Sequence, residues 1–162
     1  MKVLFCYTNV NGLHADSFAD GISMIIAVTK KAGHEIRYVQ IFDKKEYSDF
    51  SKAVKEFKPD VIGYTAVSSQ FSVVIELSEI AKLIDSKIIT ACGGVHTTLY
   101  PRSVLESKAL DAIFIGDGEK PFLDFLSKIE KKEDWRVNDN IAFEREDGTM
   151  KKNKLAPLMT AE

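Results

Sequence analysis

Short apolar runs alternate with longer amphipathic segments along most of this chain. The runs cover residues 2–8, 34–41, 60–66, 87–92 and 111–116, and each ends in turn-forming or small residues. The segments between them repeat apolar residues with the period of a helix, at roughly 17–32, 47–57, 71–84, 101–107 and 121–129. Gly33 is placed to cap the first helix, and Pro101 and Pro121 are placed to begin the last two. The alternation therefore predicts five strands, each followed by a helix.

The predicted strands are apolar over nearly their whole length. Such strands, separated by helices, indicate a parallel sheet that is covered on both faces and connected by right-handed crossovers. We expect an α/β fold with a doubly wound five-stranded parallel sheet, flavodoxin-like or Rossmann-like, (βα)5, with strand order 2-1-3-4-5. A ligand of such a sheet lies beyond the carboxyl ends of the strands, where the order reverses. The loops to inspect are therefore 9–16, 67–71, 93–98 and 116–120.

Composition narrows the classes of protein. The chain has 162 residues, 45% of them hydrophobic, which suits one domain with a full core. Its 22 basic and 24 acidic residues are spread along the chain and give a net charge of −2, so no nucleic-acid partner is expected. No apolar run approaches the roughly 18 residues of a membrane span, and the opening MKVLFCYTN lacks the features of a signal peptide. We expect no membrane partner and a cytoplasmic location.

Residues that bind metals are few. Cys6 and Cys92 each lie inside an apolar run, where a thiol usually acts as a small buried hydrophobe. Two cysteines without a CxxC motif cannot hold an iron–sulfur cluster by themselves. The histidines, His14, His34 and His96, form no close set of ligands in the sequence. We expect no structural metal.

Several ligand classes of this fold lack their motifs here. The ends of the first and third predicted strands carry no aspartate of the kind a response-regulator receiver needs. The loop 9–16 lacks the Ser/Thr-rich phosphate site of a flavodoxin. The segment GDGEKP places Pro121 where a dinucleotide-binding motif has its third glycine, and no P-loop occurs. The sequence therefore does not favour binding of a nucleotide through its phosphates.

The pattern changes after Trp135. Residues 140–147 and 149–154 alternate like a small hairpin around Asp147 and Gly148. The sequence offers this hairpin no evident partner. We therefore divide the chain into a domain at 1–134 and a hairpin or linker at 135–162, which we expect to lead to an absent C-terminal domain.

Four segments together resemble a known family. They are GISMIIAVTKKAGHEIRYVQI, KPDVIGYTAVSSQF, ITACGGVHTTLYP and LDAIFIGDGEKPFLDFL. In this order they resemble the N-terminal cobalamin-binding domain of B12-dependent radical S-adenosylmethionine enzymes, the group that includes the anaerobic magnesium-protoporphyrin monomethyl ester cyclase. The resemblance runs from Met1 to about Ile129, and the 135–162 hairpin is similar to the segment that precedes the radical domain in that family.

The resemblance implies cobalamin as the cofactor. It implies that the corrin lies over the carboxyl edge of the sheet while the nucleotide tail enters a slot beside the central strands. Glycines allow a ligand to approach the backbone closely, and the family usually carries a hydroxyl after the third strand that bonds the tail or its dimethylbenzimidazole base. The residues expected to bind the cofactor are Asn9, Asn11, Thr65, Ser68, Ser69, Gly93, Gly94, His96, Thr97, Gly116, Gly118 and Glu119.

One motif of the broader B12 family is missing. Methionine-synthase-like domains carry DxHxxG, with the histidine as lower ligand of cobalt. Aligned on His14, this chain has Gly12 in place of the aspartate and Ser17 in place of the glycine. Without the aspartate nothing fixes the tautomer of the ring, so we expect no protein ligand to the metal and keep His14 as the residue to test.

The resemblance also implies a larger parent enzyme, a B12-dependent radical methyltransferase or oxidative cyclase. Its radical domain, in cis, would hold S-adenosylmethionine and a [4Fe-4S] cluster, while the present chain alone would catalyse nothing. Two alternatives stay open: a flavodoxin-like docking module without a cofactor, and a nucleotide- or FMN-binding domain. For these, the pair Gly93–Gly94 is an ordinary tight turn, and Glu119 is an acidic residue that stabilises a helix start.

Overall fold

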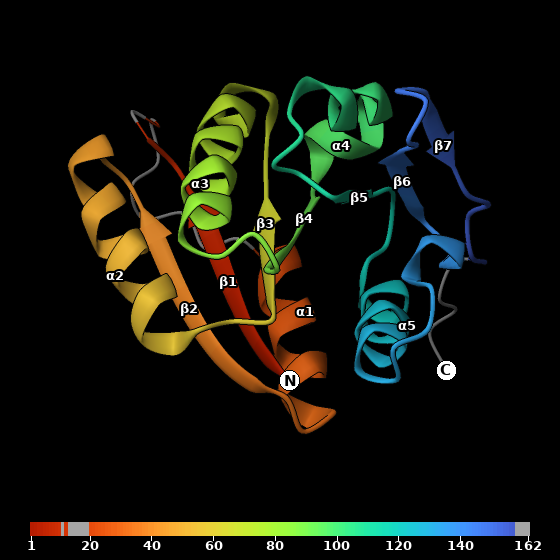
Figure 1. Ribbon diagram of the computed structural model, residues 1–162, viewed down its shortest axis with the longest axis horizontal. Helices are drawn as coiled ribbons and strands as arrows, with labels where there is room; N and C mark the ends of the chain where they lie inside the picture. The colour runs from red at the N-terminus through yellow and green to blue at the C-terminus, as the bar shows by residue number, and fades with distance from the viewer. Residues whose placement is uncertain (11, 13–19, 158–162) are drawn as a thin grey trace.

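A mixed β-sheet forms the centre of the molecule in the computed structural model, which describes residues 1–10, 12 and 20–157 (Figure 1). Within these residues the sheet has seven strands in the order β2-β1-β3-β4-β5-β6-β7. The strands are β1 Lys2–Thr8, β2 Glu35–Ile41, β3 Val61–Thr65, β4 Ile89–Gly93, β5 Ala112–Phe114, β6 Ile141–Glu144 and β7 Met150–Lys152. The first five are parallel and follow the predicted order 2-1-3-4-5, which confirms the fold class.

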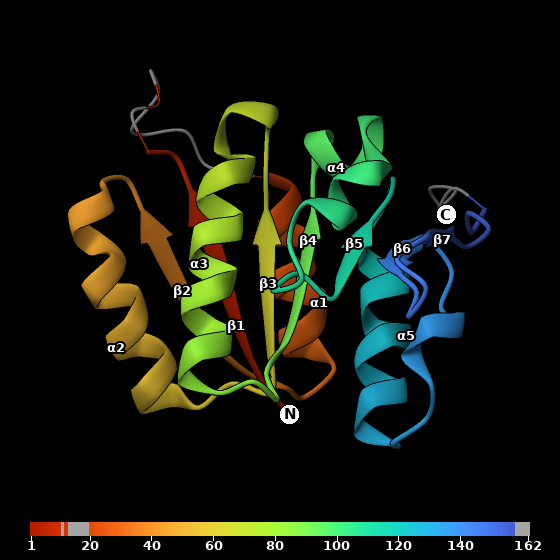
Figure 2. The same ribbon diagram turned by 45° about the horizontal axis from the view of Figure 1, so that its top comes forward.

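Helices cover both faces of the parallel part of the sheet (Figures 1 and 2). They are α1 Asp20–Lys31, α2 Tyr47–Phe57, α3 Phe71–Ile84, α4 Val95–Leu99 and α5 Glu119–Glu130. Short 3₁₀ turns complete the connections: η1 Lys44–Glu46, η2 Ser68–Gln70, η3 Pro101–Glu106 and η4 Trp135–Val137. Buried side chains of α2 and α3 pack on one face of the sheet, and those of α1 and α5 pack on the other. No helix in the described part of the chain is long and apolar enough to cross a membrane.

The helix predicted at 101–107 is wrong in place and kind. A short α-helix, α4, starts directly after the Gly94 turn, and residues 101–106 form only the 3₁₀ turn η3. Tyr100 separates the two with φ −130° and ψ 72°, outside the helical region. The ring of a proline disfavours helical backbone in the preceding residue, so Pro101 ends the first helix instead of opening a longer one.

The expectation that the C-terminal hairpin has no partner is also wrong. Strand β6 pairs antiparallel with β5, through Ile113↔Ala142 and Phe114↔Ile141, and β7 pairs with β6. Ile141, Ala142 and Phe143 are buried in the core. The hairpin therefore extends the sheet from its fifth strand.

Both cysteines lie in the core, as predicted. Cys6 and Cys92 are fully buried, on the side of the sheet that α2 and α3 cover. Burial raises the pKa of each thiol well above its usual range, so both stay protonated. A buried, protonated thiol is a poor metal ligand and a poor nucleophile.

Candidate functional site

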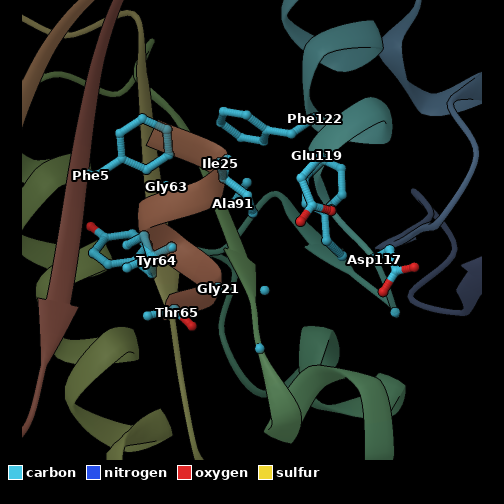
Figure 3. Close-up of a pocket in the computed structure, with 16 residues that line it drawn as sticks. Phe5, Gly21, Ile25, Gly63, Tyr64, Thr65, Ala91, Asp117, Glu119 and Phe122 are labelled. Carbon is cyan, nitrogen blue, oxygen red and sulfur yellow. The ribbon is translucent and has the colours of Figure 1, made fainter. Parts of the chain in front are cut away.

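A cavity of about 190 Å³ lies between the sheet and the helices α1 and α5 (Figure 3). We call it the slot. Strands β1, β3, β4 and β5 contribute residues to it, and it lies at the carboxyl end of β3 and β4. The sequence predicted a ligand site at this edge of the sheet.

Small residues form the floor of the slot. Register pairs Gly63 with Ala91 and Thr65 with Gly93, so that these four residues lie side by side on β3 and β4. Because successive residues of a strand point to opposite faces, all four face the same side of the sheet. Three of the four have no side chain or only a methyl group, which leaves a depression in the sheet surface.

Large apolar side chains form the walls. Phe5 comes from β1, Phe114 from β5, Phe122 from α5, and Ile22 and Ile25 from α1. The Phe122 ring lies 5.5 Å from the Phe5 ring and 5.6 Å from the Phe114 ring, measured between centroids. The three rings pack against one another along the wall, so the interior of the slot is mainly apolar.

Gly94, Gly116 and Gly118 line the end of the slot that lies nearest the carboxyl ends of the strands, which we call the mouth. Gly94 has φ 105°, and a Cβ there would lie 2.7 Å from the carbonyl oxygen of Ala66 and 2.8 Å from Thr65 Oγ1. A Cβ on Gly118 would lie 2.8 Å from Ile25 Cδ1. Asp117 and Glu119 bring carboxylates to this end of the cavity, and no lysine or arginine is among the described residues that line it.

Two threonines connect the glycine loops to each other. The Thr98 hydroxyl accepts a hydrogen bond from Gly116 N (3.0 Å) and donates one to Gly94 O (2.9 Å). Thr97 is fully buried, and its hydroxyl contacts Phe114 O at 2.8 Å and Gly94 O at 3.2 Å. Both carbonyl oxygens are acceptors, so the Thr97 hydroxyl donates its proton to the backbone and not to a ligand. Thr97 therefore stabilises the loop through these hydrogen bonds and does not line the slot.

A second cavity of about 330 Å³ adjoins the slot, with Gly21, Ile22, Thr65 and Gly94 in both linings. We call it the ledge. Asn9 and Val67 are among its other lining residues. The buried Gln70 side chain supports the ledge, because it accepts from Val10 N at 2.8 Å and donates to Val10 O at 3.0 Å.

His96 lies outside both linings. Its Nδ1 is 3.1 Å from Ser68 Oγ, and its ring stacks on Phe71 with centroids 4.2 Å apart. Nε2 is buried and has no hydrogen-bond partner among the described residues. Ser68 and Ser69 are exposed in the turn that follows β3.

The structure thus sorts the residues that the sequence singled out. Those that line the slot are Thr65, Gly93, Gly94, Gly116, Gly118 and Glu119. Asn9 lines the ledge. Ser68, Ser69, His96 and Thr97 line neither cavity. Asn11 and His14 lie outside the described residues.

Sequence reasoning missed most of the floor and walls. Gly63 gave a usable signal, because an isolated glycine inside a strand often marks a place where another group approaches the backbone. Phe5, Ile25 and Phe122 gave none, since apolar residues in strands and helices are equally expected in an ordinary core.

Most of the chain matches a known family. The profile of the B12 binding domain matches residues 10–126. The chain is 29% identical over 160 residues to cytidylyl-2-hydroxyethylphosphonate methyltransferase of Streptomyces wedmorensis, covering 87% of this chain and 30% of that protein. It is 25% identical over 138 residues to the anaerobic magnesium-protoporphyrin IX monomethyl ester cyclase of Rubrivivax gelatinosus, covering 81% and 25%.

Solved structures share the fold. The cobalamin-dependent S-adenosylmethionine radical enzyme OxsB, with aqua-cobalamin and S-adenosylmethionine bound, superposes with a TM-score of 0.78 at 16% identity, over 96% of this chain and 22% of that chain. The radical S-adenosylmethionine methyltransferase TsrM of Kitasatospora setae gives a TM-score of 0.78 at 13% identity, over 94% and 30%. The chain therefore spans less than a third of the length of each of these proteins.

Proposed function

The chain belongs to the B12-binding domain family, and from this we propose that it binds cobalamin, with the nucleotide tail in the slot and the corrin over the ledge. When bound, cobalamin would supply the organocobalt chemistry, and the residues of this chain would bind and orient it.

The observation that carries the proposal is the shape of the slot. Its floor at Ala91 and Gly93 lets a planar group lie close to the strands, beside the contacting rings of Phe5 and Phe122, which pack over Gly63. The dimethylbenzimidazole base that ends the cobalamin tail is planar and apolar, so the residues present fit it. Gly94, which tolerates no side chain, would leave the passage from ledge to slot open.

Polar groups at the mouth suit the polar parts of the cofactor. Thr65 lies in both linings, where its hydroxyl could bond the base or the tail. Asn9, on the ledge, is placed for the amide groups of a corrin. Ser68, Ser69 and His96 would reach only groups that extend beyond the ledge, and their part in binding, like that of Asn11 and of His14, stays a prediction.

In the parent protein we expect a radical domain in cis, with S-adenosylmethionine and a [4Fe-4S] cluster bound there, and methyl transfer or cyclase chemistry as the reaction. The methyltransferase of Streptomyces wedmorensis and the cyclase of Rubrivivax gelatinosus motivate this expectation. The two cysteines of this chain are both buried, so thiolate ligands for a cluster would have to come from elsewhere.

A nucleotide or FMN fits the site less well. The described lining of the slot has no lysine or arginine, and two carboxylates lie at its mouth, so the dianionic phosphate of FMN or the several charges of a nucleotide are disfavoured more than the single charge of the cobalamin phosphodiester. A docking module that binds no cofactor would not require an apolar cavity such as the slot, which a cobalamin-binding domain does require.

The test is retention of hydroxocobalamin after desalting, followed by its visible absorbance. We expect the wild-type chain to retain the corrin and Gly93→Phe to lose it. A Cβ on Gly93 would have one neighbour within 4 Å, Phe114 Cβ at 3.7 Å, so the added ring can enter the slot without backbone strain. Gly93 is preferred to Gly94 for this reason.

Ser72→Phe is the matched control. Ser72 is exposed in the first turn of α3, at the same edge of the sheet, so it receives the same ring outside the slot. It should retain cobalamin like the wild type. Retention by Gly93→Phe would exclude the slot as the seat of the tail, and no retention by any of the three chains would reject cobalamin binding by this chain.

A further inference from the structure

The backbone and side-chain polar groups of Asn140 all make hydrogen bonds. It lies just before β6, is buried, and adopts a left-handed conformation with φ 61°. Asparagine is one of the few residues other than glycine that tolerate this conformation. Residue 140 lies outside the segment 10–126 that matches the family profile.

Three of its hydrogen bonds go to the loop between β5 and α5. Nδ2 donates to Ile115 O at 2.9 Å and to Asp117 O at 3.2 Å, and Ile115 N donates to Asn140 O at 2.8 Å. Gly116, between these two residues, has φ 74°. A Cβ there would lie 3.7 Å from Asn140 Nδ2, so the amide packs against the turn that it holds.

Two further hydrogen bonds go to the C-terminal segment. Asn140 N donates to Lys154 O at 2.9 Å, and Ala156 N donates to Asn140 Oδ1 at 2.6 Å. The one side chain therefore bonds the 115–117 loop with its amino group and the segment 154–156 with its carbonyl group.

The loop held in this way is part of the slot. Gly116 and Asp117 line the slot, and Thr98 connects Gly116 to Gly94 on the other side of the mouth. We propose that Asn140 is a positioning residue of the cofactor site, which fixes the mouth of the slot and couples it to the segment 154–156. The inference rests on the proposed function for the identity of the ligand, and on the hydrogen bonds alone for the coupling.

The chemistry of the site specifies asparagine. The position needs two side-chain donors and one acceptor on a residue with positive φ, a set that aspartate, serine and alanine lack. Glycine supplies the backbone conformation without the side-chain bonds. Asn140→Gly therefore removes the three side-chain bonds without straining the chain.

We would measure the affinity for hydroxocobalamin by absorbance titration, and amide hydrogen exchange in the cofactor-free chain. Asn140→Gly should bind about tenfold more weakly, and its hydrogen-bonded amides at Ile115, Gly116 and Ala156 should exchange at least about tenfold faster. Asn140→Asp keeps the acceptor for Ala156 N and loses both donors, so exchange should rise in the loop and not at Ala156. Cobalamin should slow exchange at Ala156 in the wild type only.

Two controls separate positioning from general loosening. Lys132→Gly makes the same change at another left-handed residue, which is exposed at the end of α5. Asn153→Ala removes hydrogen bonds to Arg136 O and Asn138 O, which hold the hairpin without touching the slot. Both should keep the affinity and the slow exchange of the loop.

Unchanged exchange of the loop in Asn140→Gly would overturn the proposal. So would an affinity that falls equally in Asn153→Ala at a matched unfolding midpoint. If the wild type itself fails to bind cobalamin, the proposed function fails, while the exchange measurements still decide whether Asn140 couples the loop to the C-terminal segment.

Discussion

At the scale of single residues, His34 shows how burial makes stability depend on pH. Its Nδ1 lies 3.3 Å from the N-terminal ammonium group of Met1. Burial, and second the charge of that ammonium, lower the pKa of His34 below its ordinary value of 6.5, against a smaller opposing effect of Glu130. Protonation is therefore less favourable in the folded than in the unfolded chain.

The sign of the pH effect follows from this shift. As the pH falls through about 6.5, the unfolded chain takes up a proton at His34 more readily than the folded chain does, and stability falls. His34→Gln should remove this part of the loss. Urea unfolding midpoints of both chains at about pH 7.5 and about pH 5.5 test it, and an equal loss in the two would contradict the assignment.

Neighbouring residues can differ in ways that the sequence does not show. The sequence indicated Gly93 and Gly94 as one small-residue feature, and both do line the slot. Only Gly94 has positive φ, and only there would a Cβ clash with the backbone. That difference depends on the backbone path of the Ala66 loop, which is remote in sequence, so residue type alone could not predict it.

At the scale of elements, the β6–β7 hairpin shows where local pattern is sufficient and where it is not. Alternation predicted its strands, and an Asp-Gly pair marked its turn, where Gly148 has φ 78°. Its place beside β5 could not be predicted, because the free edge of β5 exists only once the parallel sheet has formed. Likewise, the local effect of Pro101 on Tyr100 outweighed the helical spacing at 101–107.

We predict that the hairpin is needed for stability. A chain that ends at Asp134 would lose Ile141 and Phe143 from the core, each worth roughly 1.5–3 kcal/mol when fully buried. The sum is a large part of the roughly 5–15 kcal/mol that stabilises a typical domain. Thermal and urea unfolding of chains 1–134 and 1–157 would measure the loss, and equal midpoints would show the hairpin to be dispensable.

At the scale of the whole molecule, the slot exists because elements distant in sequence meet. The alternation of strands and helices predicted the fold and the edge of the sheet that carries the site, since parallel topology places all strand ends together. The depth and apolar character of the slot depend on how α1 and α5 pack against Gly63 and Ala91. Packing of this kind is not encoded in any one segment.

The apolar lining predicts selectivity for the base of the cofactor. A corrinoid with adenine in place of dimethylbenzimidazole would bury an amino group and ring nitrogens among Phe5, Ile25 and Phe122. Unsatisfied buried polar groups cost about 1–3 kcal/mol each, so we expect at least about tenfold weaker binding. Titration with hydroxocobalamin, its adenine analogue and cobinamide, which has no base, would measure this. Equal affinities would show that the base does not enter the slot.

The burial of Cys6 and Cys92 has a practical consequence for such work. Protonated and enclosed on the side of α2 and α3, the two native thiols should resist alkylation under native conditions. A cysteine introduced on the surface, as in Ser72→Cys, would then react selectively with a spin label or a fluorophore. The native chain is thus already suited to single-site labelling, with the probe at the edge of the sheet where the slot opens.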